Sequence, residues 1–299
     1  MKLDPNIERK SAIINRHLDV QQHMSGVPAF SVIEFNPTEL CNRTCEFCPR
    51  VDPEVYPNRN LFLRPELMEK IARELGEFNY SGKALFSAFG EPLLHKELET
   101  LIRLLREHCP DVRIESVTNG DYLTVERARS LFDSGLSTLL VSMYDGPHQK
   151  EEFESIRHRA GLREDQLITR IRYLSREEGF GLTMSNRAGN IQIEELGVAE
   201  VAEPLNQECF YPHYQFTVDW DGSVLLCPHD WGKKIRAGNL NDQSILEIWN
   251  GKALTFSRKR LGCGDRRFDP CNVCDVTGTL MGRNHFEAWE SYFSGEGGK

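Results

Sequence analysis

The sequence predicts an α/β protein whose core is a parallel sheet curved into part of a barrel, followed by a small domain of different character. Between about residues 30 and 160, short apolar runs alternate with segments of helical spacing. Repeated strand–helix units of this kind build parallel sheets with right-handed crossovers. After about residue 207 the pattern changes to a hairpin and clustered cysteines. A length of 299 residues suits one large domain, or one medium domain with a smaller appendage.

Composition restricts the class of protein. The chain is 39% hydrophobic and 27% charged, carries a formal net charge of −9 and has no apolar run near the ~20 residues of a membrane helix. Residues 1–5 lack the pattern of a secretion signal, so we expect a cytoplasmic protein. The negative charge disfavours nucleic-acid and anionic-membrane partners, and it favours a small-molecule substrate that is cationic.

Three closely spaced cysteines are the feature around which the chain is organised. Cys41, Cys45 and Cys48 form a C-x₃-C-x₂-C array directly after the apolar run 30–35, so they occupy a loop at the end of a predicted strand. Thiolates are the usual ligands of iron–sulfur clusters, and three of them leave one iron of a [4Fe–4S] cluster open to a small molecule. A structural zinc loop and a set of buried free thiols are the alternatives.

The array resembles the signature of the radical SAM superfamily, C-x₃-C-x-Φ-C, with Phe47 at the aromatic position. The resemblance implies a partial (β/α)₆ barrel of TIM type, in which S-adenosylmethionine (SAM) chelates the open iron and Phe47 lies near its adenine. It also implies reductive cleavage of SAM to a 5′-deoxyadenosyl radical, which takes a hydrogen atom from the substrate. The electron would come from a reducing protein such as flavodoxin or ferredoxin.

The remaining elements of the first domain follow in order. Residues 1–25 are expected to form an N-terminal capping segment, with a surface helix over 6–24. Residues 64–75 have a proline in the first turn and apolar positions at helical spacing, which predicts a helix. Residues 181–187 are expected to be the last strand of a barrel domain that covers 26–200. The strands and helices between them are predicted, in alternation, at 84–89, 96–108, 112–117, 124–134, 138–143 and 149–160.

The loops after these strands carry the predicted binding residues, because such a barrel has its active site at the carboxyl ends of its strands. Phe89-Gly90-Glu91-Pro92 resembles the Gly-Gly-Glu motif of the family. There Gly90 would allow close approach to the ligand, and Glu91 would accept hydrogen bonds from the SAM ammonium. Arg187 would bind the SAM carboxylate in bidentate fashion, and a surface arginine is the alternative.

The other strand ends match the family loops that line the SAM and substrate pocket. The alternative is simple turn formation by Asn-Gly and Asp-Gly pairs. The resemblance implies further SAM contacts from Asn119, Ser142 and Ser185, and substrate contacts from Asp121, Tyr144 and Asp145.

The second domain, expected over 201–299, opens with a hairpin. Asp221-Gly222 lies between two apolar runs, which is a strong two-residue turn signal, and a helical segment begins near Ile245. The spacing of its cysteines resembles the abbreviated SPASM, or twitch, domain, in which four cysteines ligate an auxiliary [4Fe–4S] cluster. A Cys₄ zinc site is the alternative. The four candidate ligands are Cys209, Cys227, Cys271 and Cys274.

Two cysteines remain. Cys109 ends a predicted helix and is expected to be a small buried residue. Cys263 lies among glycines and charged residues, where an accessible thiol could return a hydrogen atom to a carbon radical. At this point the chain resembles radical SAM epimerases of aminosugars. A fifth ligand of the auxiliary cluster and an incidental thiol are the alternatives for Cys263.

Three functions follow from these observations. The first is an epimerase that inverts a carbon of an aminosugar or aminoglycoside, with Cys263 as the hydrogen donor. The second is a dehydrogenase that resembles aminocyclitol-oxidising enzymes, in which the auxiliary cluster takes an electron from the substrate. The third is a non-catalytic metal-binding module, which would not cleave SAM.

Overall fold

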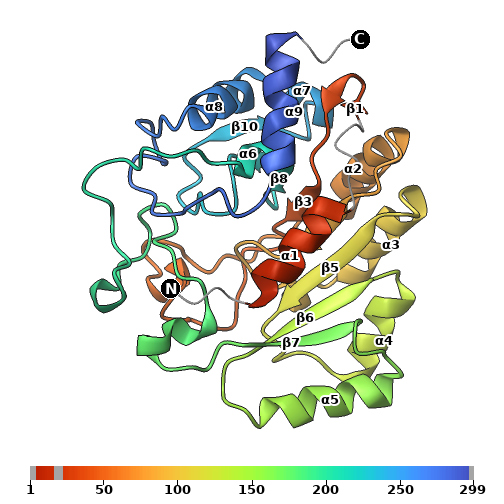
Figure 1. Ribbon diagram of the computed structural model, residues 1–299. Helices are drawn as coiled ribbons and strands as arrows, with labels where there is room; N and C mark the ends of the chain where they lie inside the picture. The colour runs from red at the N-terminus through yellow and green to blue at the C-terminus, as the bar shows by residue number, and fades with distance from the viewer. Residues whose placement is uncertain (1–4, 17–22, 296–299) are drawn as a thin grey trace.

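The computed structural model describes residues 5–16 and 23–295, and among them eight strands form one sheet in the order β10-β9-β8-β3-β4-β5-β6-β7 (Figure 1). Neighbouring strands from β8 to β7 run parallel, and β9 and β10 extend the sheet in antiparallel fashion. The predicted α/β architecture is therefore confirmed. The strands are β3 (Val32–Phe35), β4 (Lys83–Phe86), β5 (Arg113–Thr118), β6 (Thr138–Met143), β7 (Leu167–Ile171), β8 (Gln215–Val218), β9 (Ser223–Leu225) and β10 (Arg236–Asn239).

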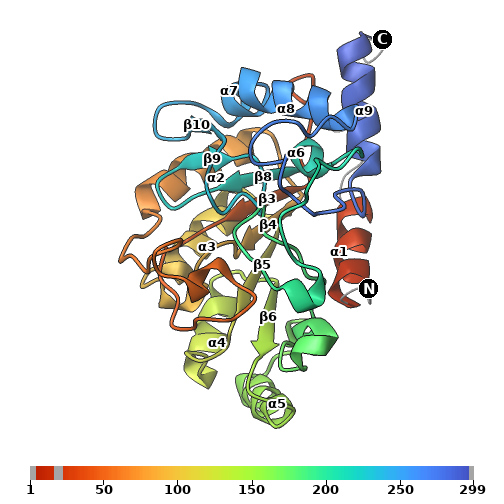
Figure 2. The ribbon, with the colours of Figure 1, turned by 90° about the vertical axis from the view of Figure 1, so that its left-hand side faces the viewer.

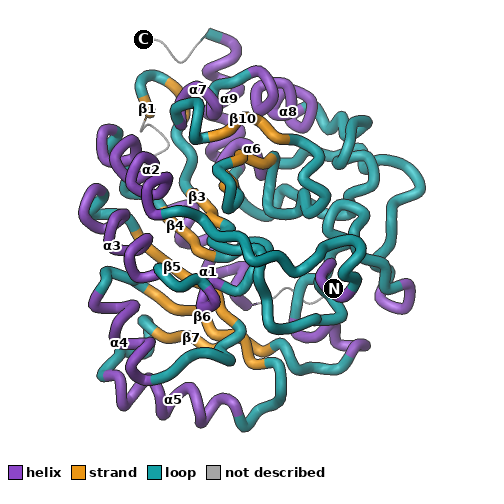
Figure 3. The backbone as a smooth tube through the Cα atoms, turned by 180° about the vertical axis from the view of Figure 1, so that it is seen from behind, coloured by secondary structure: helices purple, strands orange, loops and turns teal. Residues whose placement is uncertain are grey.

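Four helices cover the outer face of the parallel strands (Figure 3). Each lies in the connection between two strands that are adjacent in the sheet, as the strand–helix alternation predicts. Their apolar residues, spaced three and four apart, are buried against the sheet. The helices are α2 (Pro65–Glu77), α3 (Leu98–His108), α4 (Val125–Asp133) and α5 (Gln149–Ala160).

The prediction of a barrel strand at 181–187 is wrong. Gly181 ends a 3₁₀ segment, η3 (Arg176–Gly181), and Arg187 has a φ of 50°, which is incompatible with extended backbone. The place beside β3 is taken instead by β8, the first strand of the predicted hairpin, and β7 completes the opposite edge. The hairpin thus belongs to the same sheet as the barrel strands.

Helix α1 (Pro5–Arg16) lies on the inner face of the sheet, opposite α2 to α5 (Figures 1 and 2). It was predicted as a surface cap, but Arg9 reaches Glu115 on β5 at 2.5 Å. Residues 17–22 of the predicted helix lie outside the described residues. The chain continues in a small antiparallel pair, β1 (His23–Met24) and β2 (Val27–Pro28).

The last part of the chain packs around β8 to β10. Arg258 is buried between two indole rings, 3.9 Å from the centroid of Trp249 and 3.8 Å from that of Trp289. None of the helices described is long and apolar enough to cross a membrane. The helices here are α6 (Tyr211–Tyr214), α7 (Ile245–Trp249), α8 (Lys252–Gly262) and α9 (Arg283–Ser294), and short 3₁₀ turns elsewhere are η1 (Pro49–Val51), η2 (Pro92–Leu94) and η4 (Glu194–Leu196).

Candidate active site

The three-cysteine loop faces a cavity of about 260 Å³ at the carboxyl ends of the parallel strands. Cys41, Cys45 and Cys48 all line this cavity, which we call the loop cavity. The loop follows β3, as predicted. The structure brings most of the predicted SAM-contacting residues to the same place, because the ends of β4, β5 and β6 meet there. Those that line the loop cavity are Phe47, Gly90, Glu91, Asn119 and Arg187, and Tyr144, predicted to contact substrate, lines it as well.

The three thiols are partly shielded from water, and burial raises the pKa of each of them, to about 12 for Cys45. Free thiols at these positions would therefore be protonated at neutral pH. Bound iron ions would stabilise the thiolate form, since a coordinating thiol is deprotonated by the charge of the metal. Three thiols that line one cavity fit a [4Fe–4S] cluster with an open iron.

Arg43 fixes the loop to two strand ends. Its guanidinium donates to both oxygens of Asp121, at 2.7 and 2.5 Å, and to both oxygens of Asp145, at 2.8 and 2.6 Å. It also lies 5.0 Å from the centroid of the Tyr144 ring. Two fork-shaped pairs of this kind give directional as well as electrostatic attraction. Asp121 and Asp145, predicted to contact substrate, thus engage the loop, and neither lines the loop cavity.

Glu91 joins the loop after β4 to the end of β5. Its buried carboxylate accepts hydrogen bonds from Thr118 Oγ1 at 2.6 Å, Asn119 N at 2.7 Å and Leu93 N at 2.9 Å. Burial raises the pKa of Glu91 to about 7, against the opposing effect of these three donors. The preceding Gly90 is required for a different reason from the one expected, because a Cβ there would lie 1.9 Å from the carbonyl oxygen of Thr38.

Two of the predicted SAM contacts, Ser142 and Ser185, do not line the loop cavity. Ser142 is buried and accepts a hydrogen bond from Arg170 at 2.8 Å. Ser185 Oγ lies 3.4 Å from Nδ1 of His229, and Arg187 Nη1 lies 3.5 Å from the same nitrogen. Neither serine lines the loop cavity. The SAM contacts of these residues remain predictions.

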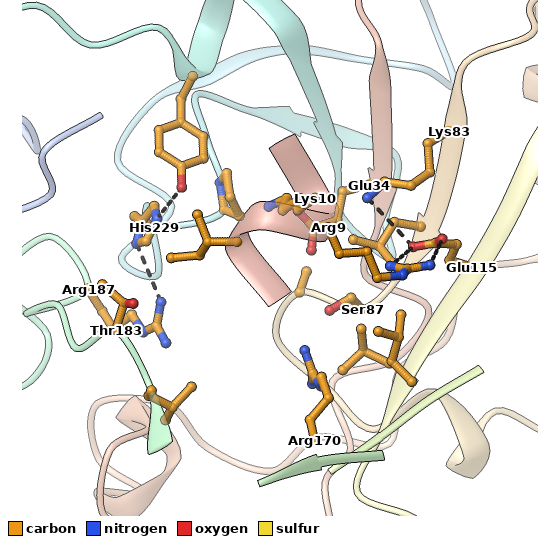
Figure 4. A pocket seen from close by; sticks show the side chains of 18 of the residues that line it. Arg9, Lys10, Glu34, Lys83, Ser87, Glu115, Arg170, Thr183, Arg187 and His229 are labelled. Atoms are coloured by element: carbon orange, nitrogen blue, oxygen red, sulfur yellow. Dashed lines mark hydrogen bonds and ion pairs between the residues drawn. The ribbon is translucent and has the colours of Figure 1, made fainter. Parts of the chain in front are cut away.

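A second cavity of about 310 Å³, the inner cavity, continues from the first between the sheet and α1 (Figure 4). Its charged lining was not predicted. Glu34 and Glu115 interrupt apolar strands, and this was the signal available in the sequence, because a charge inside a buried strand needs a partner or a function. Residues common to both cavities include Ser87, Val117, Arg170, Arg172, Arg187 and Trp231.

The four C-terminal cysteines line one small, mainly apolar cavity, as the spacing predicts. Burial raises the pKa of each thiol, to about 11 for Cys274. Gly278 gives one of them room, because a Cβ there would lie 2.5 Å from the sulfur of Cys209. Within the described ranges no three Cys, His, Asp or Glu side chains form a site for a single metal ion. Four thiols around one cavity fit a larger, four-iron cluster.

Cys263 lies apart from both groups of cysteines. It follows α8, its side chain is exposed, and it lines neither the loop cavity, the inner cavity nor the four-cysteine cavity. Its expected role as a hydrogen donor therefore has no geometric support here. Cys109 is buried at the end of α3, where its thiol donates to the Ala72 carbonyl at 3.5 Å.

Family models match two parts of the chain. The radical SAM superfamily model matches residues 35–181, and the model of the SPASM iron-sulfur cluster-binding domain matches residues 209–275. An S-adenosyl-L-methionine-dependent 2-deoxy-scyllo-inosamine dehydrogenase from Niallia circulans is 30% identical over 248 residues, which are 82% of this chain and 93% of that protein. A GTP 3′,8-cyclase from Nautilia profundicola is 31% identical over 112 residues, 37% of this chain and 34% of that protein.

Solved structures agree with these matches. BtrN in complex with AdoMet and 2-DOIA is 26% identical, with a TM-score of 0.70, and the match covers 85% of this chain and 97% of that chain. AdoMet-bound anSMEcpe, at 16% identity and a TM-score of 0.52, shares the fold over 89% of this chain and 93% of that chain. The chain therefore belongs to the radical SAM superfamily, with a C-terminal SPASM domain, and its cofactors are SAM and two [4Fe–4S] clusters.

Proposed function

We propose that this enzyme is a dehydrogenase that oxidises a secondary alcohol of a small polyhydroxylated amine, such as an aminocyclitol. The observation that carries the proposal is the similarity to the Niallia circulans dehydrogenase, which extends over 93% of that protein. The epimerase expected from the sequence is less well supported, because Cys263 is exposed and lines none of the cavities near either group of cysteines.

The two adjoining cavities suit a cofactor and a small substrate. When bound, SAM and its cluster supply a 5′-deoxyadenosyl radical that removes a hydrogen atom from a substrate carbon. The contacts of Arg43 with Asp121 and Asp145 hold the three-cysteine loop in position. Glu91 lines the loop cavity, and its Oε2 accepts one hydrogen bond, from Asn119 N. The inner cavity then holds the substrate next to the cofactor.

Oxidation of an alcohol to a ketone removes a second electron and the hydroxyl proton. Tyr211 and His229 line both the inner cavity and the four-cysteine cavity, and the Tyr211 hydroxyl lies 3.2 Å from His229 Nε2. An electron that leaves the substrate would therefore cross one layer of side chains to reach the auxiliary cluster. A cationic substrate, a flavodoxin or ferredoxin as reductant, and a cytoplasmic location remain predictions.

Product mass in deuterated water tests the proposal. Anaerobically reconstituted enzyme is incubated with SAM, dithionite and 2-deoxy-scyllo-inosamine in D₂O, and 5′-deoxyadenosine and product are quantified by mass spectrometry. We expect equal amounts of 5′-deoxyadenosine and of a product that has lost two hydrogens. A product that differs from the substrate only by one solvent deuterium would instead establish the epimerase, and absence of SAM cleavage would contradict both.

A further inference from the structure

Two carboxylates enter the inner cavity from the sheet, and they differ in their partners (Figure 4). Glu115 on β5 forms ion pairs with Arg9 at 2.5 Å, Arg113 at 2.7 Å and Lys83 at 3.7 Å. Burial acts to raise the pKa of Glu115, but these cations outweigh it and lower the pKa to about 2. Glu115 is therefore fully engaged by the protein itself.

Glu34 on β3 is buried, and only one of its two carboxylate oxygens has a hydrogen-bond donor among the described residues. Its Oε2 accepts a hydrogen bond from the side-chain amide of Gln215. Among the described residues, no donor lies within hydrogen-bond distance of Oε1, and no cation lies within ion-pair distance of the carboxylate. Since Glu34 lines the inner cavity, this oxygen is available to a ligand.

Lys10 on α1 is the matching donor. Its side chain also lines the inner cavity, and within the described part of the chain its ammonium has neither a hydrogen bond nor an ion pair at contact distance. Burial lowers the pKa of Lys10, and the nearby charge of Glu34 opposes this shift. An ammonium has three N–H donors and no acceptor, so it needs oxygen partners when water is removed.

Lys10 lies outside the two segments that the family models match. Helix α1 ends at Arg16, before residue 35, where the radical SAM match begins, and far from the SPASM match at 209–275. The helix nevertheless forms one wall of the inner cavity (Figure 4). A segment outside the shared domains that lines the substrate cavity is well placed to determine which substrate is bound.

We propose that Glu34 and Lys10 recognise the substrate, with Glu34 accepting a hydrogen bond from its ammonium group and Lys10 donating to the oxygen of a neighbouring hydroxyl. This inference rests on the proposed function, because an aminocyclitol carries an amine and hydroxyls on one small ring. A free acceptor and a free donor in one cavity match such a ligand, whereas the saturated Glu115 contributes to the fold.

Binding measurements on three variants test the assignment. The SAM-loaded enzyme, kept without reductant, is titrated calorimetrically with 2-deoxy-scyllo-inosamine and with the cyclitol in which a hydroxyl replaces the amine. Glu34→Gln should weaken binding of the amine by about tenfold or more and of the hydroxyl compound much less, because a charge-assisted hydrogen bond is lost only with the amine. Lys10→Met should weaken both compounds by about tenfold. Glu8→Gln, at an exposed position of the same helix, is the matched control and should change neither.

Unchanged SAM affinity in each variant reports an intact fold. If Glu34→Gln lowers SAM affinity, Glu34→Asp is measured in place of that variant. Glu34→Asp keeps the negative charge, so it should still prefer the amine over the hydroxyl compound, at reduced affinity for both. If wild-type enzyme oxidises the amine but Glu34→Gln and Lys10→Met bind it as tightly as wild type, this inference is wrong and the proposed function stands. If wild-type enzyme binds neither compound, both fail. Tighter wild-type binding of the hydroxyl compound would refute the ammonium assignment for Glu34.

Discussion

The two cysteine sites are built in opposite ways. Cys41, Cys45 and Cys48 belong to one short loop and face an open cavity, lined by both polar and apolar side chains, that continues into the inner cavity. The other four cysteines come from three separate segments and surround a small, mainly apolar cavity. One site is thus local in sequence and accessible to small molecules, and the other is assembled by the fold and closed.

The difference shows in the side chains that hold each site. The local loop is fixed from outside, by the ion pairs of Arg43 to Asp121 and Asp145. In the assembled site, the buried side chain of Arg266 donates to backbone carbonyl groups close in sequence to Cys209 and Cys274, including those of Gln207 and Val276. A site that admits ligands needs external anchors, because its own cavity cannot be filled by packing.

The largest effect should come from removing the open site. Replacing Cys41, Cys45 and Cys48 by alanine should lower the iron content from about eight to about four atoms per chain and abolish SAM cleavage. Iron assay and chromatographic detection of 5′-deoxyadenosine measure the two effects. Retention of cleavage by this variant would mean that SAM binds elsewhere and would end the distinction between an open and a closed site.

The closed site should be sensitive to a single added carbon. Gly278→Ala places a Cβ 2.5 Å from the sulfur of Cys209, at a φ of 75°. We expect loss of the auxiliary cluster, with about four irons retained and SAM still cleaved. Gly197→Ala is the matched control, since Gly197 also has a positive φ, of 65°, but no atom within 4 Å of the added carbon. Equal iron content in both variants would contradict the packing argument.

Glu91 should make SAM binding depend on pH. Its pKa of about 7 means that the carboxylate form increases between pH 6 and pH 8. SAM should therefore bind several-fold more tightly at pH 8 than at pH 6. The contribution of Glu91 to the free energy of unfolding has the opposite dependence: it is fully present below the usual pKa of a glutamate and is lost as the pH rises through 7. Glu91→Gln should weaken SAM binding about ten- to a hundredfold and abolish this pH dependence. A pH-independent wild-type dissociation constant would place Glu91 outside SAM recognition.

The smallest effect is expected at Cys263, which belongs to neither site. Cys263→Ala should keep both clusters and turn over within about twofold of wild type, and its unfolding free energy should change by less than about 0.5 kcal/mol because the side chain is exposed. Iron content, product yield and thermal unfolding check these three statements. Formation of 5′-deoxyadenosine without product would instead restore Cys263 as the hydrogen donor.

The sequence predicted the elements whose signal is local. Strand 138–143 and helix 149–160 were located to the residue, because the strand is a mainly apolar run buried on both faces and the helix buries Phe153 and Ile156 at helical spacing. Residues 181–187 were misassigned because Leu182 and Met184 alternate as in a strand, yet Met184 packs against a small separate cluster that contains Ile191 and Ile193. No local propensity indicates the positive φ at Arg187.

In the candidate site, the cysteines could be predicted from the sequence, but the partners of the charged residues could not. Cysteine spacing predicted two groups of candidate ligands, and the structure brings the members of each group to one cavity. The partners of the charged residues could not be predicted, because Arg43, Lys10 and Glu34 meet residues that are distant in sequence or line a cavity made by several elements. Such contacts depend on which face of each strand turns inward, and this is decided by the tertiary fold.

The pairing of β8 with β3 has a consequence for how such enzymes can be recombined. The radical SAM match ends at residue 181 and the SPASM match begins at 209, yet the two parts share one hydrogen-bonded sheet. The position of one cysteine site relative to the other therefore depends on this strand pairing and not only on the segment that connects the two matches. Exchanging the C-terminal part with that of another enzyme would require a new strand to match β3 in register, so the two halves must change together.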